Sequence, residues 1–89
     1  MDKPLQNRVA VVTGASRGIG RAAALALAEA GAHVIALART QGALESLDDE
    51  IRAKGGSATL VPLNLKDFEA LDRLGAAIHE RWGKLDILL

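Results

Sequence analysis

The 89-residue sequence contains no cysteine and no tyrosine, and it has one tryptophan and one phenylalanine. Without cysteine, disulfide bonds and thiolate chemistry are excluded. Basic and acidic residues balance at 11 each, so the basic excess of a nucleic-acid or membrane surface is missing. The polar opening MDKPLQNR is unlike a signal peptide, and no apolar run is long enough to span a bilayer. We therefore expect a soluble, cytoplasmic protein that binds neither nucleic acid nor membrane.

Short apolar runs alternate with segments of helical periodicity along the whole chain. The runs at 8–14, 32–38, 57–63 and 85–89 have the composition of buried strands. Between them, apolar residues recur at helical spacing in segments 18–31, 40–55 and 67–83, and each segment ends at a glycine. Thr40 and Asp67 are suited to N-cap the second and third helices. We place Phe68, Leu71 and Trp82 on one apolar face of the third helix.

This alternation predicts an α/β fold in one domain, residues 1–89. The expected architecture is a Rossmann-like three-layer sandwich with a parallel sheet of four strands in the order 3-2-1-4, part of a doubly wound fold. The first two helices then cover one face and the third helix covers the other. Pro62 lacks an N–H group, and this order places its strand on an edge, where proline is tolerated. Residues 85–89 lie on the opposite edge.

The loop TGASRGIG, residues 13–20, joins the first strand to the first helix. Gly14 allows a tight turn, Gly18 leaves the backbone open to a phosphate group, and Gly20 lets the helix pack close to the sheet. The free N–H groups of the first helical turn and the helix dipole favour an anion there. Because the loop follows a strand and opens a helix, we interpret it as a phosphate-binding loop rather than an ordinary glycine-rich turn. Its spacing differs from G-x-G-x-x-G, and it is not a P-loop.

The spacing of Thr13, Gly14, Gly18 and Gly20 resembles the cofactor loop of the short-chain dehydrogenase/reductase family. The likeness continues through GAHVIALAR, LVPLNLKD and GKLDILL, in the family's order. It implies an NAD- or NADP-dependent oxidoreductase that oxidises alcohols or reduces carbonyls, with the pyrophosphate over Gly18 and Ile19. The loop residues that we assign to cofactor binding are Gly14, Ser16, Arg17, Gly18, Ile19 and Gly20.

The end of the second strand indicates which dinucleotide is bound. A carboxylate there would bind the ribose hydroxyls of NAD, whereas arginine accommodates the 2′-phosphate of NADP. Arg39 and Thr40 stand at this position, and Arg17 is a second candidate for the phosphate. We therefore expect NADP(H) to be preferred over NAD(H). The alternative for both arginines is a solvated loop position without a ligand.

The end of the third strand is predicted to hold the adenine. The resemblance implies an acceptor for the adenine amino group, usually an aspartate, where this sequence has Asn64. An amide can accept from that amino group and also donate to a ring nitrogen. We assign Asn64 and Leu65 to the adenine pocket, with a plain strand-end turn as the alternative. His33 and His79 lack partners at metal spacing, so we assign no metal site, and we expect Trp82 to pack.

The chemistry of hydride transfer is only partly present. In the family a tyrosine donates the proton and a lysine four residues later lowers its pKa, but this chain has no tyrosine. It also lacks the Asn-Asn-Ala-Gly motif that follows the corresponding last strand in the family. We therefore assign no catalytic residue and expect an N-terminal NAD(P)-binding half, truncated before the catalytic half. A small carbonyl or alcohol substrate would bind only to the complete protein.

Two other functions remain open from the sequence. The chain could be a dinucleotide-binding module without catalysis, or belong to another Rossmann-like enzyme such as a methyltransferase. Methyltransferases usually carry an acidic residue after the second strand, where Ala38 and Arg39 stand. We also expect a homo-oligomer for the protein. In the chain alone the last strand lies on an open apolar edge, which the rest of the full protein would normally cover. The isolated chain should associate through that strand or the third helix, or stay partly unfolded.

Overall fold

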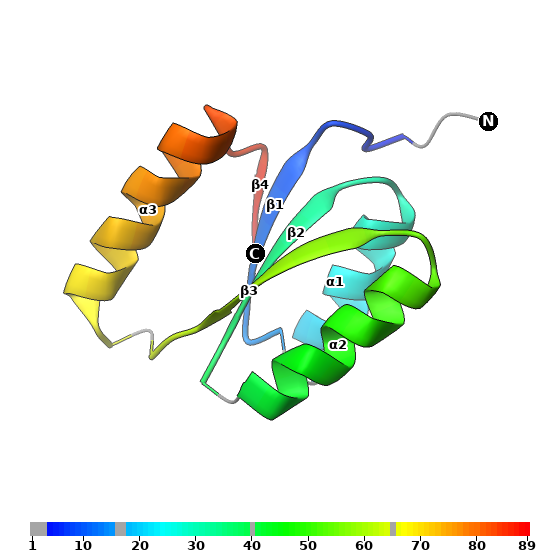
Figure 1. Cartoon of the computed structure of the whole chain (residues 1–89), viewed down its shortest axis with the longest axis horizontal. Coiled ribbons are helices and arrows are strands. Elements are labelled where there is room, and N and C mark those ends of the chain that lie inside the picture. The colour runs from blue at the N-terminus through cyan, green and yellow to red at the C-terminus, as the bar shows by residue number, and fades with distance from the viewer. Residues whose placement is uncertain (1–3, 16–17, 40, 65) are drawn as a thin grey trace.

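The computed structural model describes residues 4–15, 18–39, 41–64 and 66–89. Along these residues four strands alternate with three helices, in the predicted order (Figure 1). The elements are β1 (Val9–Thr13), α1 (Gly18–Glu29), β2 (His33–Ala38), α2 (Gln41–Ala53), β3 (Ser57–Pro62), α3 (Phe68–Trp82) and β4 (Ile87–Leu88). Within this described part of the chain, no helix is both long enough and apolar enough to cross a membrane.

The four strands form one parallel sheet in the order β3-β2-β1-β4, which confirms the predicted fold class. β2 pairs along its whole length with β3, and its first five residues pair with β1, so β2 has the most extensive strand pairing in the sheet. Pro62 ends the edge strand β3 opposite Ala38. Beyond the proline, the Leu63 amide donates to the Ala38 carbonyl at 2.9 Å, and this bond continues the pairing toward the carboxyl edge.

The helices cover the two faces of the sheet as predicted, with α1 and α2 on one face and α3 on the other (Figure 1). The core under α1 and α2 is well filled, because Leu44, Leu47 and Ile51 are completely buried against the sheet. On the other face, Ile78 is the buried residue of α3. Trp82 is among the half-buried residues of α3 that pack around this second core.

Helix α3 begins and ends as the sequence predicts, but its apolar face is shorter than predicted. The Asp67 side chain accepts from the Ala70 amide, and Gly83 closes the helix in a left-handed conformation with φ 72°. Phe68, however, is 76% exposed. Its assignment to a packed apolar face was wrong, because the first turn of α3 precedes the part of the helix that reaches the sheet. The covered face starts at Ala70 and Leu71.

Strand β4 is also shorter than the predicted strand 85–89, although its hydrogen bonding to β1 continues on both sides. The Asp86 amide donates to the Val9 carbonyl at 2.9 Å, and the Thr13 amide donates to the Leu89 carbonyl at 2.8 Å. The Asp86 carboxylate accepts from the Val9 amide at 2.9 Å and from Arg8 at 3.2 Å. The bond from Val9, together with Arg8 and Lys84, lowers the pKa of Asp86. This carboxylate therefore fixes the start of β4 beside β1.

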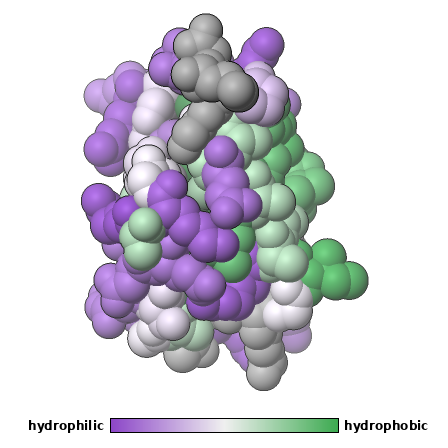
Figure 2. All heavy atoms as spheres, turned by 90° about the vertical axis from the view of Figure 1, so that its right-hand side faces the viewer, coloured by the Kyte–Doolittle hydropathy of each residue, from purple (hydrophilic) through white to green (hydrophobic). Residues whose placement is uncertain are grey.

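The free edge of β4 is apolar. Leu85, Leu88 and Leu89 are 44%, 68% and 54% exposed. Figure 2 shows hydrophobic residues gathered along one side of the molecule, the side turned away from the viewer in Figure 1, where β4 and α1 are drawn paler. Hydrophilic residues dominate the rest of that view. An exposed apolar edge strand is a template for pairing with another chain.

We predict that this edge makes the chain associate. At high micromolar concentration, sedimentation should detect species larger than the 9.3 kDa chain. Leu88→Lys should reduce the association, because a charge on an edge strand opposes pairing. Phe68→Lys is the matched control, since Phe68 is exposed to a similar extent but lies at the start of α3. A monodisperse monomer with strongly protected amides at 86–89 would show that the edge does not drive association.

Candidate functional site

The carboxyl ends of β1, β2 and β3 bring three of the predicted site residues to one edge of the sheet. Thr13 pairs with Leu37, and Leu37 pairs with Val61, so these strands end at nearly the same level. Gly14, Arg39 and Asn64 follow those strand ends in the sequence, and Figure 1 shows β1, β2 and β3 running toward the lower side of the sheet. In parallel α/β sheets, ligands bind at this edge. The structure therefore places the described site residues together, at the position expected for a ligand.

The connection from β1 to α1 is held close to the sheet. Gly14 and Gly18 have φ of 61° and 63°, a left-handed conformation that favours glycine. Ala15 is completely buried between them, and its amide donates to the Leu37 carbonyl at 3.0 Å. A Cβ at Gly20 would lie 2.2 Å from the Gly14 carbonyl oxygen, closer than any side chain can approach. The predicted close packing of Gly20 is thus confirmed, against the backbone at the end of β1.

The start of α1 is suited to an anion. Its first turn contains no acidic residue, so the free N–H groups and the helix dipole are not already neutralised by a carboxylate. The start of α3 is different, because Asp67 caps it and Glu69 lies in its first turn. Beside the amide groups of α1, Ile19 is 91% exposed. An isoleucine this exposed at the same edge provides an apolar surface for a ligand to cover.

Arg39 gives the end of β2 a positive charge. Arg39 is exposed, and within the described residues no ion pair joins it to a carboxylate. Arg21 is engaged elsewhere, in an ion pair with Glu50 that links α1 to α2. The first turn of α2 also contains no acidic residue. Among the described residues, the edge beyond β2 therefore carries the positive charge of Arg39 and no acidic residue in the first turn of the next helix.

Asn64 is held by its own turn. Its side-chain carbonyl accepts from the Lys66 amide at 2.9 Å, and its main-chain carbonyl accepts from the Asp67 amide at 2.9 Å. This geometry fixes the side chain of Asn64 where β3 leads into α3. A carbonyl oxygen has two lone pairs and the amide has two N–H donors, so Asn64 keeps capacity for a ligand. The strand-end turn, which was the alternative to a binding role, is present, and its hydrogen bonds are compatible with the predicted role of Asn64 at the adenine.

Four of the predicted site residues, Ser16, Arg17, Thr40 and Leu65, lie outside the described residues. Among the described ones, no group of three or more histidine and acidic side chains is arranged to hold a metal ion.

The opposite edge of the sheet holds a second polar group that the sequence reasoning missed. His33, at the start of β2, contacts Trp82 of α3 with ring centroids 5.2 Å apart. Its ring nitrogens lie 2.8 Å from the hydroxyl oxygens of Ser57 and Thr59. The signal in the sequence was the alternation of polar residues at 33, 57 and 59 on one face of two strands, which needs the strand register before it can be read.

Comparisons with known proteins agree with this geometry. Residues 8–89 match the family model for short chain dehydrogenases. A fatty acyl-CoA reductase of Acinetobacter baylyi is 41% identical over 85 residues, which cover 96% of this chain and 29% of that protein. A 2,3-dihydro-2,3-dihydroxybenzoate dehydrogenase of Bacillus subtilis is 36% identical over 87 residues, 98% of this chain and 33% of that protein.

A solved structure of a metagenomic short-chain oxidoreductase in complex with NADP is similar over 96% of this chain and 38% of that one. The TM-score is 0.92 at 39% sequence identity. A three-layer α/β fold with a glycine-containing loop at the carboxyl edge of its sheet is typical of the dinucleotide-binding class of proteins. Because the family model matches most of its length, the chain belongs to the short-chain dehydrogenase family. It spans about a third of the length of these relatives.

We predict that Gly20→Ala will distort the loop and the start of α1. The added methyl group meets main-chain atoms that cannot move aside, and overpacking of this kind costs about 1–3 kcal/mol or more. Gly42→Ala is the matched control, because a Cβ at Gly42 in α2 meets nothing within 4 Å. It should be neutral or stabilising by up to about 1 kcal/mol. Urea unfolding followed by Trp82 fluorescence would measure both, and equal stabilities for the two variants would contradict the packing argument.

Proposed function

We propose that this chain forms the NAD(P)-binding half, residues 1–89, of an NADP-dependent oxidoreductase of the short-chain dehydrogenase/reductase type. The observation that carries the proposal is that two features suited to an anion lie together at the carboxyl edge of the sheet. Glycines with left-handed backbone angles precede a helix whose first turn has no acidic residue, and Arg39 stands where a carboxylate would bind NAD, at the end of the neighbouring strand. The solved relative that contains NADP supports this choice for a chain of the same fold.

Each part of the edge has a role in this proposal. The N–H groups at the start of α1, at Gly18, Ile19 and Gly20, would hold the pyrophosphate, and Gly14 and Ser16 would shape the turn beneath it. Arg39 would hold the 2′-phosphate by charge-assisted hydrogen bonds. Arg17 and Thr40 are proposed to assist it. Asn64 would orient the adenine through its amide, with Leu65 beside the ring.

The cofactor, when bound, would supply or accept the hydride in carbonyl reduction or alcohol oxidation. The residues of this chain bind and orient it, and they leave the proton transfer to residues that the chain does not contain. The named activities of the relatives, which act on different compounds, support an oxidoreductase without indicating a particular substrate. We propose a small carbonyl or alcohol substrate and a homo-oligomer for the complete protein.

We predict that the 2′-phosphate contributes strongly to binding. The chain should bind 2′,5′-ADP more tightly than AMP, and NADPH more tightly than NADH, by roughly 10- to 150-fold, the equivalent of about 1.5–3 kcal/mol for a charge-assisted contact. Arg39→Asp should narrow or reverse both preferences. Arg73→Asp makes the same change of charge at an exposed position on α3 and should leave them unchanged. Equal affinities in the unaltered chain, measured by calorimetry, would exclude the proposed phosphate contact.

A separate prediction is that the 89-residue chain binds the dinucleotide without catalysing its oxidation. The reason is the absence of tyrosine, the residue that donates the proton in this family. Purified chain mixed with NADPH and a panel of aldehydes and ketones should show no carbonyl-dependent loss of absorbance. A steady-state rate that depends on the added carbonyl compound would instead require a proton donor among the residues present.

A further inference from the structure

His33 stands at the amino edge of the sheet, far from the proposed cofactor loop. It is the first residue of β2 and pairs with Ser57, the first residue of β3. Nδ1 lies 2.8 Å from the Ser57 hydroxyl oxygen, and Nε2 lies 2.8 Å from the Thr59 hydroxyl oxygen. In the neutral ring one nitrogen donates and the other accepts, and a hydroxyl group can take either role. The ring is thereby fixed in orientation, with its face toward α3.

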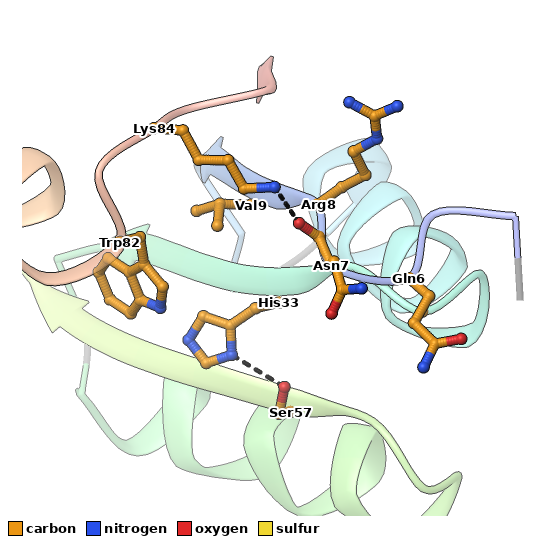
Figure 3. Close-up of a pocket in the computed structure, with 9 residues that line it drawn as sticks. Gln6, Asn7, Arg8, Val9, His33, Ser57, Trp82 and Lys84 are labelled. Atoms are coloured by element: carbon orange, nitrogen blue, oxygen red, sulfur yellow. Dashed lines mark hydrogen bonds between the residues drawn. The ribbon is translucent and has the colours of Figure 1, made fainter.

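Trp82, the last residue of α3, covers this ring. The two rings are tilted by 35° with centroids 5.2 Å apart, within the range of favourable aromatic contact. Figure 3 shows the indole and the imidazole facing each other beside the strands. Trp82 also packs near Ile78 around the second core, so its contact with His33 helps to hold the C-terminal end of α3 on the sheet.

The surroundings favour the neutral form of His33. Burial lowers the pKa of His33 below its ordinary value of 6.5, and the positive charges of Arg81 and Arg52 lower it further. Arg81 comes from α3 and Arg52 from α2, while β3 offers the two hydroxyl groups named above. Arg8 and Lys84 line the same hollow as His33, and both are paired with Asp86.

One interaction acts in the opposite direction. An indole face attracts a cation by about 0.5–1 kcal/mol at an exposed site, so an imidazolium could gain from Trp82. The Arg81 guanidinium, however, already lies over that ring, 4.8 Å from its centroid. A second cation on the same indole would repel the first. Protonation would also force both ring nitrogens to donate, so any hydroxyl that donates to the neutral ring must turn around.

We propose that the contact between His33 and Trp82 is a pH-sensitive latch, which holds the C-terminal end of α3 on the sheet while the imidazole is neutral and loosens when it is protonated. Protons reach the ring through an open hollow of about 480 Å³, lined by Asn7, Trp82 and Lys84 among others (Figure 3). Lys84 is also bonded to the Asn7 carbonyl. The cations of this hollow are thus already engaged, which makes it a path for solvent rather than a ligand site.

The direction of the pH effect follows from the lowered pKa of His33. A histidine whose pKa is lowered by folding binds fewer protons in the closed state than in the open state. The latch is therefore fully stable above pH 6.5, and stability is lost as the pH falls from 6.5 toward the pKa of the closed state. In that interval the equilibrium constant for opening should rise by up to about tenfold per pH unit. Below the closed-state pKa the effect should level off.

Trp82 itself is the probe, because it is the only tryptophan and the chain has no tyrosine. Loss of the His33 contact changes the surroundings of the indole, so Trp82 emission should change on acidification with a midpoint below pH 6.5. His33→Gln, which keeps hydrogen-bonding groups but cannot titrate, should abolish the transition. His79→Gln removes the other histidine, which is exposed on α3, and should leave it unchanged. A midpoint at or above 6.5, or a transition that persists in His33→Gln, overturns the latch.

Hydrogen exchange tests the loosening without relying on a variant. After correction for intrinsic rates, amides 79–83 should lose protection between pH 7.5 and pH 5.5, including the Gly83 amide that donates to the His79 carbonyl. Amides of β2 in the core, such as that of Ile35, should keep their protection from exchange over the same pH range. An NMR titration of His33 in the unaltered chain gives its pKa on the same sample. Protonation of His33 without loss of protection at 79–83 also overturns the proposal.

Discussion

The close approach of α1 to the end of β1 determines the shape of the carboxyl edge. A Cβ at Gly20 would lie 2.2 Å from the carbonyl oxygen of Gly14 and 3.1 Å from that of Thr13, and the first of these distances is too short for any side chain. Because the helix starts this close to the strand, its free N–H groups lie directly at the rim of the sheet. The same close approach continues along the helix, where Ala24 and Ala28 are buried and allow the helix to lie near the strands and α2. The packing of α1 and the anion-binding geometry therefore depend on the same small residues.

Much of this arrangement could be predicted from the sequence because the signals are local. Alternating runs fixed the order of elements, Asp67 and Gly83 marked the ends of α3, and Pro62 indicated an edge strand. These residues act on the backbone within a few positions, so their effect does not depend on the rest of the fold. The gathering of Gly14, Arg39 and Asn64 at one edge follows from parallel topology alone, since all three come directly after strands.

The features that sequence reasoning missed depend on contacts between distant segments. Phe68 has the right spacing for the apolar face of α3, but spacing does not reveal where a helix first meets the sheet. Strand β4 is shorter than its apolar run, although Asp86 and Leu89 on either side of it also hydrogen-bond to β1. His33 became meaningful only when the register placed it beside Ser57 and when α3 brought Trp82 over it. Periodicity along one segment carries no information on such pairings.

The helices on the two faces of the sheet bury different amounts of apolar surface, and α3 buries few large apolar side chains. Completely buried leucine and isoleucine side chains contribute about 1.5–3 kcal/mol each, and α2 has three of them. α3 has one buried isoleucine, so it depends more on contacts at its ends. The Asp67 cap holds one end next to Asn64, and the ring pair of Trp82 and His33 holds the other. Elements with few buried contacts open first. Because α3 connects the turn of Asn64 with β4, the least firmly packed helix is also the one that joins the carboxyl edge to the apolar edge.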